Sequence, residues 1–285
     1  MSKLFHNMQD AAKLSAERGA DSPALAELLE EVGADTELAD RATSNVLQDC
    51  RRLEMLPLKR PFLPSSDETP ATHGAFEAYR ALRTKLVRFQ SGEGVRSVVV
   101  TSAEAGEGKT VSVLNLALSL AQLPSQRVLL IDADLRTGGL SAVTGAVEPP
   151  GLAEVLAGEA PFEAAVIATN VQNLYIIGAG EAKRPAGDLF SGPKFKDFIG
   201  WCNQTFTMVL VDCPPMIGLA DFEIVSAACD GVLIVVRAQR TKREVLTTLG
   251  PKLQGKKLLG VLLNGQERQR HRAHYGYYYS KIGQK

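Results

Sequence analysis

The sequence of 285 residues contains little cysteine, no net charge and no long apolar run. Its four cysteines are scattered without the spacing of metal ligands, so we expect buried thiols in a reducing compartment. The 32 basic and 32 acidic side chains balance, which removes any global attraction to nucleic acid or to an acidic membrane. No run approaches the roughly 20 apolar residues that span a bilayer, and the N-terminal residues are too polar for a signal peptide. These absences predict a cytoplasmic protein.

The composition changes near residue 75. Periodic apolar positions predict a helical N-terminal extension over residues 1–56, with one amphipathic helix near 23–32 and a second from about 36 to 53. Proline, serine and threonine are frequent in residues 57–75, which predicts a linker because proline breaks both helix and sheet. The extension would be a separate hairpin, a docking arm or a partly disordered segment.

From residue 76 to 265, apolar runs alternate with helix-patterned segments. The apolar runs have the continuous hydrophobicity of strands that are buried on both faces of a parallel sheet. They cover residues 98–101, 127–131, 174–177, 208–211, 232–236 and 258–263. Helical patterns lie between them, at residues 111–123, 151–158, 195–201, 221–229 and 241–253. This alternation predicts an α/β domain built on a doubly wound, mostly parallel sheet, whose strand order cannot be read from the spacing.

Residues 102–110 (SAEAGEGKT) join the first of these strands to the following helix. Glycines let the backbone curl so that successive N–H groups and the positive end of the helix meet phosphate oxygens. Lys109 would then reach the β- and γ-phosphates, and Thr110 would contact Mg²⁺. A plain glycine-containing turn is the competing interpretation, but the order of strand, loop, Lys-Thr and helix favours a nucleotide site. The predicted nucleotide-binding residues are Ala105, Gly106, Glu107, Gly108, Lys109, Thr110 and Val111.

Acidic residues end two further strands. Asp132 and Asp134 follow the apolar run at 127–131. Being two residues apart, they are expected to leave the strand on one side and to enter the crevice at its carboxyl end. The alternative is that one caps the next helix and the other faces solvent. Asp212 ends the run at 208–211, in the arrangement that reaches Mg²⁺ in P-loop nucleotide sites. Together with the glycine-containing loop, these aspartates predict a site for a nucleotide with Mg²⁺.

Two charged or aromatic features flank the predicted site. Glu77, Arg80 and Arg83 recur every three residues, so they lie on one side of a helix-compatible segment. On the sequence alone, a solvated charged face is the simplest interpretation of them. The basic segment 266–285 holds four of the six tyrosines, at Tyr275, Tyr277, Tyr278 and Tyr279. These tyrosines would form an aromatic packing patch, stack on single-stranded nucleic acid, or serve as a substrate in a flexible tail.

Together, the motifs resemble those of the bacterial tyrosine kinases (BY-kinases), the autokinases of capsule and exopolysaccharide export. Residues 105–110 resemble the Walker A motif of that family, residues 132–136 (DADLR) its Walker A′ motif and residues 211–215 (VDCPP) its Walker B motif. Residues 77–83 are similar to its ExxRxxR oligomerisation motif, and the tail is similar to its tyrosine cluster. The resemblance covers about residues 76–285.

The sequence departs from this family pattern at several places. Ala105 stands where the family usually has proline, residues 137–139 read TGG where it usually has Arg-Pro, and Arg184-Pro185 replaces its usual Asn-Pro. These departures concern the surface that receives the acceptor rather than the nucleotide site. Partitioning ATPases of the MinD/ParA type carry a signature lysine where this chain has Glu104, which favours the kinases.

The resemblance implies a P-loop kinase domain at residues 76–265 that uses ATP and Mg²⁺. It would phosphorylate the tyrosines of its own tail (266–285) in trans, within a ring-like homo-oligomer. Lys109 would bind the phosphates, Asp132 would orient or deprotonate the incoming phenol, and Mg²⁺ would be positioned by Thr110, Asp134 and Asp212. A separate membrane protein of the polysaccharide co-polymerase type would activate the kinase and recruit it to the membrane. The alternative is a MinD/ParA-like ATPase assembly switch without kinase activity.

Overall fold

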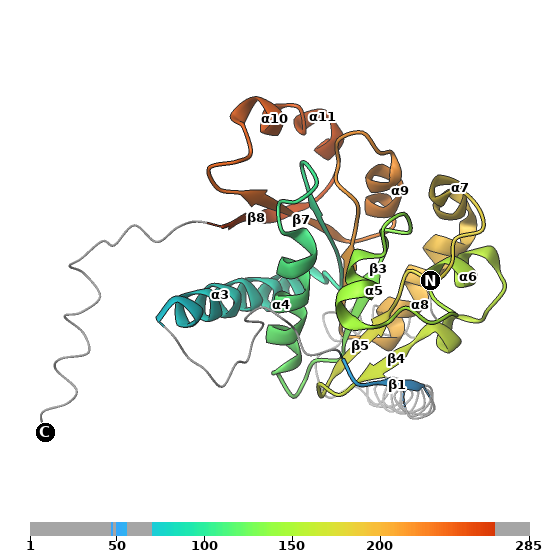
Figure 1. Cartoon of the computed structure of the whole chain (residues 1–285). Helices are drawn as coiled ribbons and strands as arrows, with labels where there is room; N and C mark the ends of the chain where they lie inside the picture. Colours follow the sequence, from blue (N-terminus) through green and yellow to red (C-terminus); the bar gives the residue numbers. More distant parts are fainter. Residues whose placement is uncertain (1–46, 48–49, 56–69, 266–285) are drawn as a thin grey trace, which may run out of the picture.

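The computed structural model describes residues 47, 50–55 and 70–265 (Figure 1). These residues form an eight-stranded sheet in the order β1-β4-β5-β3-β6-β2-β7-β8. Neighbouring strands run parallel except β4 and β5, which are antiparallel. The strands are β1 Arg51–Leu53, β2 Ser97–Ser102, β3 Val128–Asp132, β4 Ile167–Thr169, β5 Leu174–Ile177, β6 Met208–Asp212, β7 Gly231–Arg237 and β8 Leu258–Asn264. The prediction of a mostly parallel α/β sheet is confirmed.

Helices cover both faces of this sheet (Figure 1). Helices α3 and α4 pack on one face, and α6 to α9 pack on the other. The helices are α3 Pro70–Glu93, α4 Lys109–Ala121, α5 Gly139–Thr144, α6 Leu152–Ala157, the 3₁₀ helix η1 Phe162–Ala165, α7 Ala186–Ser191, α8 Pro193–Thr205, α9 Asp221–Ala227, α10 Arg243–Thr247 and α11 Gly250–Leu253. Within the described residues, no helix combines the length and apolarity needed to cross a membrane.

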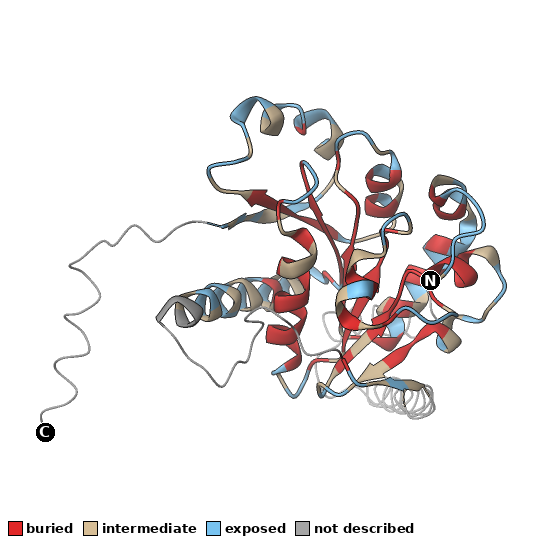
Figure 2. Ribbon diagram, viewed as in Figure 1, coloured by how far each residue is buried: buried red, intermediate tan, exposed pale blue. Residues whose placement is uncertain are grey.

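The two apolar cores follow from the alternation of side chains along the central strands. Val98 and Val100 of β2 belong to the core under α3 and α4, whereas Val99 belongs to the core on the other face. All six residues of β2 are buried, and Figure 2 shows buried residues concentrated in the sheet and on the helix sides that face it. The second core also holds aromatic side chains from α7 to α9, such as Phe190, Phe195, Phe198 and Phe222. Burial on both faces explains why the central strands form continuous apolar runs.

The N-terminal part differs from its predicted second helix at residues 50–53, whereas residue 47 is helical. Arg51–Leu53 is the edge strand β1, so the predicted helix at 36–53 is wrong at its end. The strand pairs in parallel with β4, and the Arg51 guanidinium donates to three carbonyl oxygens, those of Glu148, Pro149 and Pro150, at 2.6–3.3 Å. Local periodicity cannot reveal a strand whose partner lies far along the chain. The other predicted helical residues of the extension, apart from 47 and 50, lie outside the described residues.

Elements in the rest of the chain also differ from the predictions. Helix α3 begins at Pro70, inside the predicted linker at 57–75. The predicted helix at 241–253 is two short helices, α10 and α11, and Pro251 lacks the N–H that a continuous helix would need at that point. The prediction omits β4, α5 and α7, because segments of three to six residues carry too little periodicity to be recognised.

The start of α6 packs tightly against the turn that follows β5. We therefore expect a larger side chain at this contact to destabilise the fold. A Cβ added at Gly151 would lie 2.4 Å from the backbone nitrogen of Gly180 and 2.6 Å from the backbone oxygen of Gly178. Overpacking of this kind costs about 1–3 kcal/mol, so Gly151→Ala should lower the melting temperature by roughly 2–12 °C. The matched control is Gly187→Ala in α7, where nothing lies within 4 Å of the added Cβ. Equal melting temperatures for the two variants would contradict the prediction.

Candidate nucleotide-binding site

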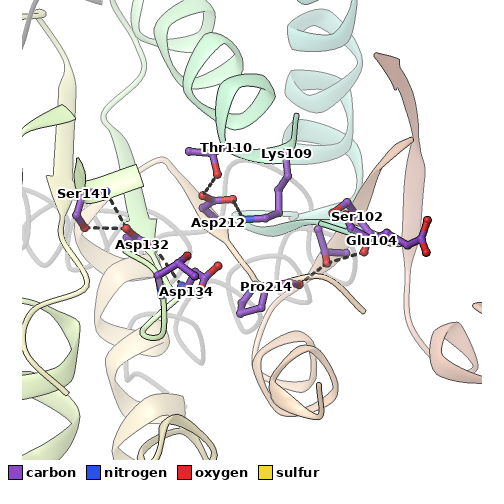
Figure 3. A network of polar contacts seen from close by, with 11 residues as sticks. Ser102, Glu104, Lys109, Thr110, Asp132, Asp134, Ser141, Asp212 and Pro214 are labelled. Carbon is purple, nitrogen blue, oxygen red and sulfur yellow. Dashed lines mark hydrogen bonds and ion pairs between the residues drawn. The ribbon is translucent and has the colours of Figure 1, made fainter. Parts of the chain in front are cut away.

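The strand order brings the three predicted motifs to one edge of the sheet. β6 lies between β2 and β3, so the P-loop at 102–110 and the aspartates that end β3 and β6 meet at the carboxyl ends of adjacent strands. Asp132 and Asp212 occupy paired positions in the register of β3 and β6. Figure 3 shows Lys109, Thr110, Asp132, Asp134 and Asp212 gathered around this edge. The three motifs thus lie together at one edge of the sheet.

The P-loop has the curled backbone that its glycines permit. Gly106 and Gly108 have φ values of 79° and 91°, in the left-handed region that side chains rarely adopt. Gly108 is the N-cap of α4, and its carbonyl accepts a hydrogen bond from Ser112 N at 2.9 Å. The amino end of α4 therefore begins inside the loop, where its free N–H groups favour an anion. Ala103, which stands where the strict motif has glycine, is fully buried beneath the loop.

Lys109 and Thr110 both converge on Asp212. Lys109 Nζ lies 2.7 Å from Asp212 Oδ1, and the Thr110 hydroxyl donates to Asp212 Oδ2 at 2.9 Å. Asp212 is completely buried. Burial raises the pKa of Asp212 to about 6, against the opposing effect of Lys109. The lysine and threonine of the P-loop are thus held at the end of β6 by one carboxylate.

Asp132 and Asp134 differ from the expectation that both side chains enter the crevice. β3 ends at Asp132, so the strand alternation that would align the two does not extend to Asp134. Asp132 Oδ2 accepts from the backbone N–H and the hydroxyl of Ser141, at 2.8 and 2.7 Å, and its Oδ1 accepts from Asp134 N at 3.1 Å. Burial raises the pKa of Asp132, while the bonds from Ser141 oppose this. Asp134, not Asp132, lines the cleft described below.

A cleft of about 470 Å³ lies beside the P-loop, which is large enough for a nucleotide. The cleft is lined by the loop and the start of α4, by Asp134, Arg136 and Thr137, and by residues that follow β6. Arg136 is held there by Asp221, whose Oδ2 lies 3.1 Å from Arg136 Nε. Six of the seven predicted nucleotide-binding residues line the cleft: Ala105, Gly106, Gly108, Lys109, Thr110 and Val111. Glu107 does not.

The sequence interpretation missed several residues around this site. Ser141 holds Asp132, Asp221 holds Arg136, and Thr241 and Asn264 contact the P-loop. Each of these side chains comes from a segment distant in sequence from its partner or carries no motif of its own. Arg136 was also not predicted as a site residue, although it had a visible signal, since it closes the DADLR segment.

The residues present fit Mg²⁺ delivered together with a nucleotide. Among residues 47, 50–55 and 70–265, no three histidine, cysteine, aspartate or glutamate side chains are grouped closely enough to hold a metal ion by themselves. Thr110 and Asp212 nevertheless present hard oxygen atoms at the base of the P-loop, and Asp134 lines the cleft. Such ligands suit Mg²⁺, which usually completes its shell with water and substrate phosphates.

The predicted oligomerisation residues lie on α3, and they have different partners within the chain. Arg80 forms an exposed ion pair with Glu77 at 3.1 Å. Arg83 instead donates to the carbonyl oxygen of Ser119 at 2.8 Å and to Gln122 at 3.2 Å, at the end of α4. Arg83 therefore ties α3 to α4, which leaves Glu77 and Arg80 as the freer pair. The four predicted tail tyrosines lie outside the described residues.

Comparison with known proteins agrees with this geometry. A family model described as an AAA domain matches residues 95–255. Tyrosine-protein kinase YwqD of Bacillus subtilis is 33% identical over 207 residues, which cover 72% of this chain and 86% of YwqD. The kinase domain of the Escherichia coli tyrosine kinase ETK aligns at 26% identity with a TM-score of 0.66, covering 79% of this chain and 92% of that domain.

A second kind of structural relative is an ATPase. The septum site-determining protein MinD of Pyrococcus horikoshii, complexed with Mg-ADP, aligns at 27% identity with a TM-score of 0.50. The alignment covers 59% of this chain and 69% of MinD, less than for the ETK kinase domain. The P-loop sheet is thus shared with both groups, but identity over most of the length of a curated relative is found with the kinases. The chain therefore belongs to the bacterial tyrosine-protein kinase family.

Proposed function

We propose that the protein is a protein-tyrosine kinase that transfers the γ-phosphoryl group of ATP to tyrosines 275, 277, 278 and 279 of a neighbouring copy. The observation that carries the proposal is the convergence of Lys109 and Thr110 on Asp212 beside a nucleotide-sized cleft. Phosphoryl transfer depends more on positioning and charge neutralisation than on covalent chemistry by the protein. This site offers both, in a family of tyrosine kinases.

Each side chain of the site has a role in this proposal. The P-loop N–H groups and Lys109 hold the β- and γ-phosphates, which requires Lys109 to turn from Asp212 toward the nucleotide. Thr110, Asp134 and Asp212 hold Mg²⁺, which when bound offsets the negative charge of the phosphates. Arg136, paired with Asp221, presents a cation to the same cleft. The site thereby surrounds the phosphates with positive groups.

Asp132 is the proposed residue that orients or deprotonates the acceptor phenol. A phenol has a pKa near 10, so it is neutral until a base engages it. The raised pKa of the buried Asp132 makes this carboxylate a better proton acceptor than an exposed aspartate. Both of its oxygens are engaged by Ser141 and Asp134 N. The proposal therefore requires the acceptor hydroxyl to replace the Ser141 hydroxyl as a partner of Asp132.

The two tyrosines in the described residues are poor acceptors, which supports the tail. Tyr79 of α3 packs against the core beneath α3 and α4 and is hydrogen-bonded to the side chains of Ser112 and Asn115 in α4. Burial raises its pKa. Tyr175 lies in β5 with its ring centroid 5.4 Å from that of Phe206, and burial raises its pKa as well. Both side chains are thus held by contacts within the fold.

We further propose that the chain assembles into a ring-like homo-oligomer through α3. A groove of about 590 Å³ lies between α3 and the edge strand β8, and the exposed side chains of Val261 and Leu263 border it. Glu77 and Arg80 lie exposed on the same helix. A separate membrane protein of the polysaccharide co-polymerase type would recruit the chain to the cytoplasmic face of the membrane and activate it. The kinase would then regulate capsule or exopolysaccharide synthesis and export.

The second candidate is an ATPase assembly switch without kinase activity, which the likeness to MinD with bound Mg-ADP favours. A mixing experiment separates the two functions. An active chain with all four tail tyrosines changed to phenylalanine is incubated with a Lys109→Met chain that keeps its tail, together with ATP and Mg²⁺. We expect phosphotyrosine on the Lys109→Met chain, because the active copy phosphorylates its neighbour. Release of phosphate from ATP without phosphotyrosine on either chain would favour the switch.

A further inference from the structure

Glu107 is a carboxylate placed inside a loop that is shaped to bind anions. The P-loop pattern leaves this position open to many residues. A negative charge beside phosphate groups is repelled by them, and a buried charge is costly unless it is hydrogen-bonded. Glu107 is only 2% exposed and does not line the cleft, whereas its neighbours Gly106 and Gly108 do. Its side chain must therefore act elsewhere.

The carboxylate of Glu107 is used entirely within the protein. Its Oε2 accepts from the backbone N–H of Glu104 at 3.1 Å, which closes the first turn of the P-loop. Its Oε1 accepts from the hydroxyl of Thr241, in the segment that follows β7. Thr241 Oγ1 in turn accepts from the backbone N–H of Arg237 at 3.1 Å. The carboxylate thus joins the P-loop to the end of β7.

The backbone of Glu107 is held by a second segment. Asn264, the last residue of β8, donates from Nδ2 to the carbonyl oxygen of Glu107 at 2.9 Å. The contact is close, since a Cβ added at Gly108 would lie 2.0 Å from Asn264 Nδ2. A guanidinium group also borders the loop, because a Cβ at Gly106 would lie 3.4 Å from Arg240 Nη1. The curl of the loop is therefore fixed from outside by the ends of β7 and β8.

We propose that Glu107 is a positioning residue for the nucleotide, which fixes the P-loop in its anion-binding shape through Thr241 and Asn264. This inference rests on the proposed nucleotide-binding function. Glu107 does not touch the phosphates; it keeps the N–H groups of the loop arranged for them before ATP arrives. A loop that adopts this shape for only a fraction of the time binds more weakly in proportion to that fraction. Glu107 raises the fraction of time that the free loop spends in its anion-binding shape.

The hydrogen bond between Thr241 and Glu107 predicts a specific pattern of nucleotide affinity. Thr241→Val keeps the shape of the side chain but removes the hydroxyl, and hydrogen bonds to charged groups are the stronger kind. The variant should bind ATP and ADP about tenfold more weakly, by the same factor for each, because the loss precedes contact with either nucleotide. Turnover at saturating ATP should be unchanged, so KM rises while kcat does not. Thr241→Ser, which keeps a hydroxyl, should bind within about twofold of wild type.

The test is a titration of the full-length chain with a fluorescent ADP analogue and Mg²⁺, with melting temperatures measured in parallel. The matched control is Thr247→Val, which removes an exposed hydroxyl that donates to Glu244 O inside α10. Glu107→Gln tests the same hydrogen bond from the acceptor side, since the amide replaces one accepting oxygen by a donor. Glu107→Gln should also lower the affinity for the analogue. The double variant with Thr241→Val should have the same affinity as whichever single variant binds less tightly, because both changes remove one interaction.

Wild-type affinity in Thr241→Val would overturn the inference, as would failure of Thr241→Ser to restore binding. A loss of equal size in Thr247→Val would also overturn it, because the effect would then be a general one on folding. If Thr241→Val does not fold, Glu107→Gln decides alone, and wild-type affinity in that variant would be the contradicting result. A wild-type chain that does not bind the analogue would overturn the proposed function and this inference with it. A binding wild type with unaffected variants overturns the inference alone.

Discussion

Replacing Lys109 with methionine should lower tyrosine autophosphorylation by about 10²–10³-fold, because it removes a preorganised charge that stabilises the transferring phosphate. Lys109 Nζ lies at the base of the cleft, 2.7 Å from Asp212 Oδ1, where its flexible side chain can turn toward a bound nucleotide. Methionine keeps the length of the side chain but carries no charge and donates no hydrogen bond. The measurement is phosphotyrosine formed by the purified full-length chain with ATP and Mg²⁺.

The matched control for this prediction is Lys183→Met. Lys183 forms an exposed ion pair with Glu159 at 2.8 Å and does not line the cleft, so phosphorylation should be unchanged. The Lys109 variant leaves the buried Asp212 without its cationic partner, and its folding must be checked by thermal unfolding. Lys109→Arg keeps the charge and should keep the fold, but its planar group should not reproduce the contact of an ammonium. Full phosphorylation by a folded Lys109→Met chain would show that this loop does not hold the ATP.

Changing Tyr275, Tyr277, Tyr278 and Tyr279 together to phenylalanine should remove roughly nine-tenths or more of the autophosphorylation, because phenylalanine has no hydroxyl to accept phosphate. The four positions follow β8 in sequence and lie outside the described residues. Affinity for ADP should stay within about twofold of wild type, because none of the cleft-lining residues is altered. The measurement pairs phosphotyrosine detection with the fluorescent ADP titration.

Two single variants serve as controls for the tail. Tyr79→Phe and Tyr175→Phe alter the two tyrosines of the described residues, both partly buried, and should leave phosphorylation at its wild-type level. Phosphotyrosine that remains in the fourfold variant and maps to Tyr79 or Tyr175 would contradict the assignment of the tail. Loss of ADP binding together with phosphorylation would instead show that the tail supports the nucleotide site.

The parts of the site that were predictable are those with a short-range signal. The P-loop joins β2 to α4 with its glycines and Lys-Thr in a fixed order, and each key aspartate ends an apolar run. Local sequence therefore placed Lys109 and Thr110 at the start of α4 and Asp212 at the end of β6. That these strand ends are adjacent depends on β6 lying between β2 and β3, which the spacing of the strands does not reveal.

The parts that were not predictable depend on contacts between distant segments. Nothing near Asp132 indicates that Ser141 donates hydrogen bonds to its carboxylate, because this contact forms only when α5, which contains Ser141, packs beside the end of β3. The motif placed Glu107 among the nucleotide-binding residues, yet its side chain is directed to Thr241. The local pattern at Arg51–Leu53 is helical, but pairing with β4 makes this segment a strand. In each case a tertiary contact decided the structure over the local signal.

The proposed function requires the tail tyrosines to carry phosphate in the cell. Phosphotyrosine can be mapped by mass spectrometry on the protein isolated from its own cells, where any membrane activator is present. We expect phosphate on Tyr275, Tyr277, Tyr278 or Tyr279 of the wild-type chain and none there in a chain whose only change is Lys109→Met. Unmodified tail tyrosines in a wild-type chain that hydrolyses ATP would show that the tail is not the acceptor.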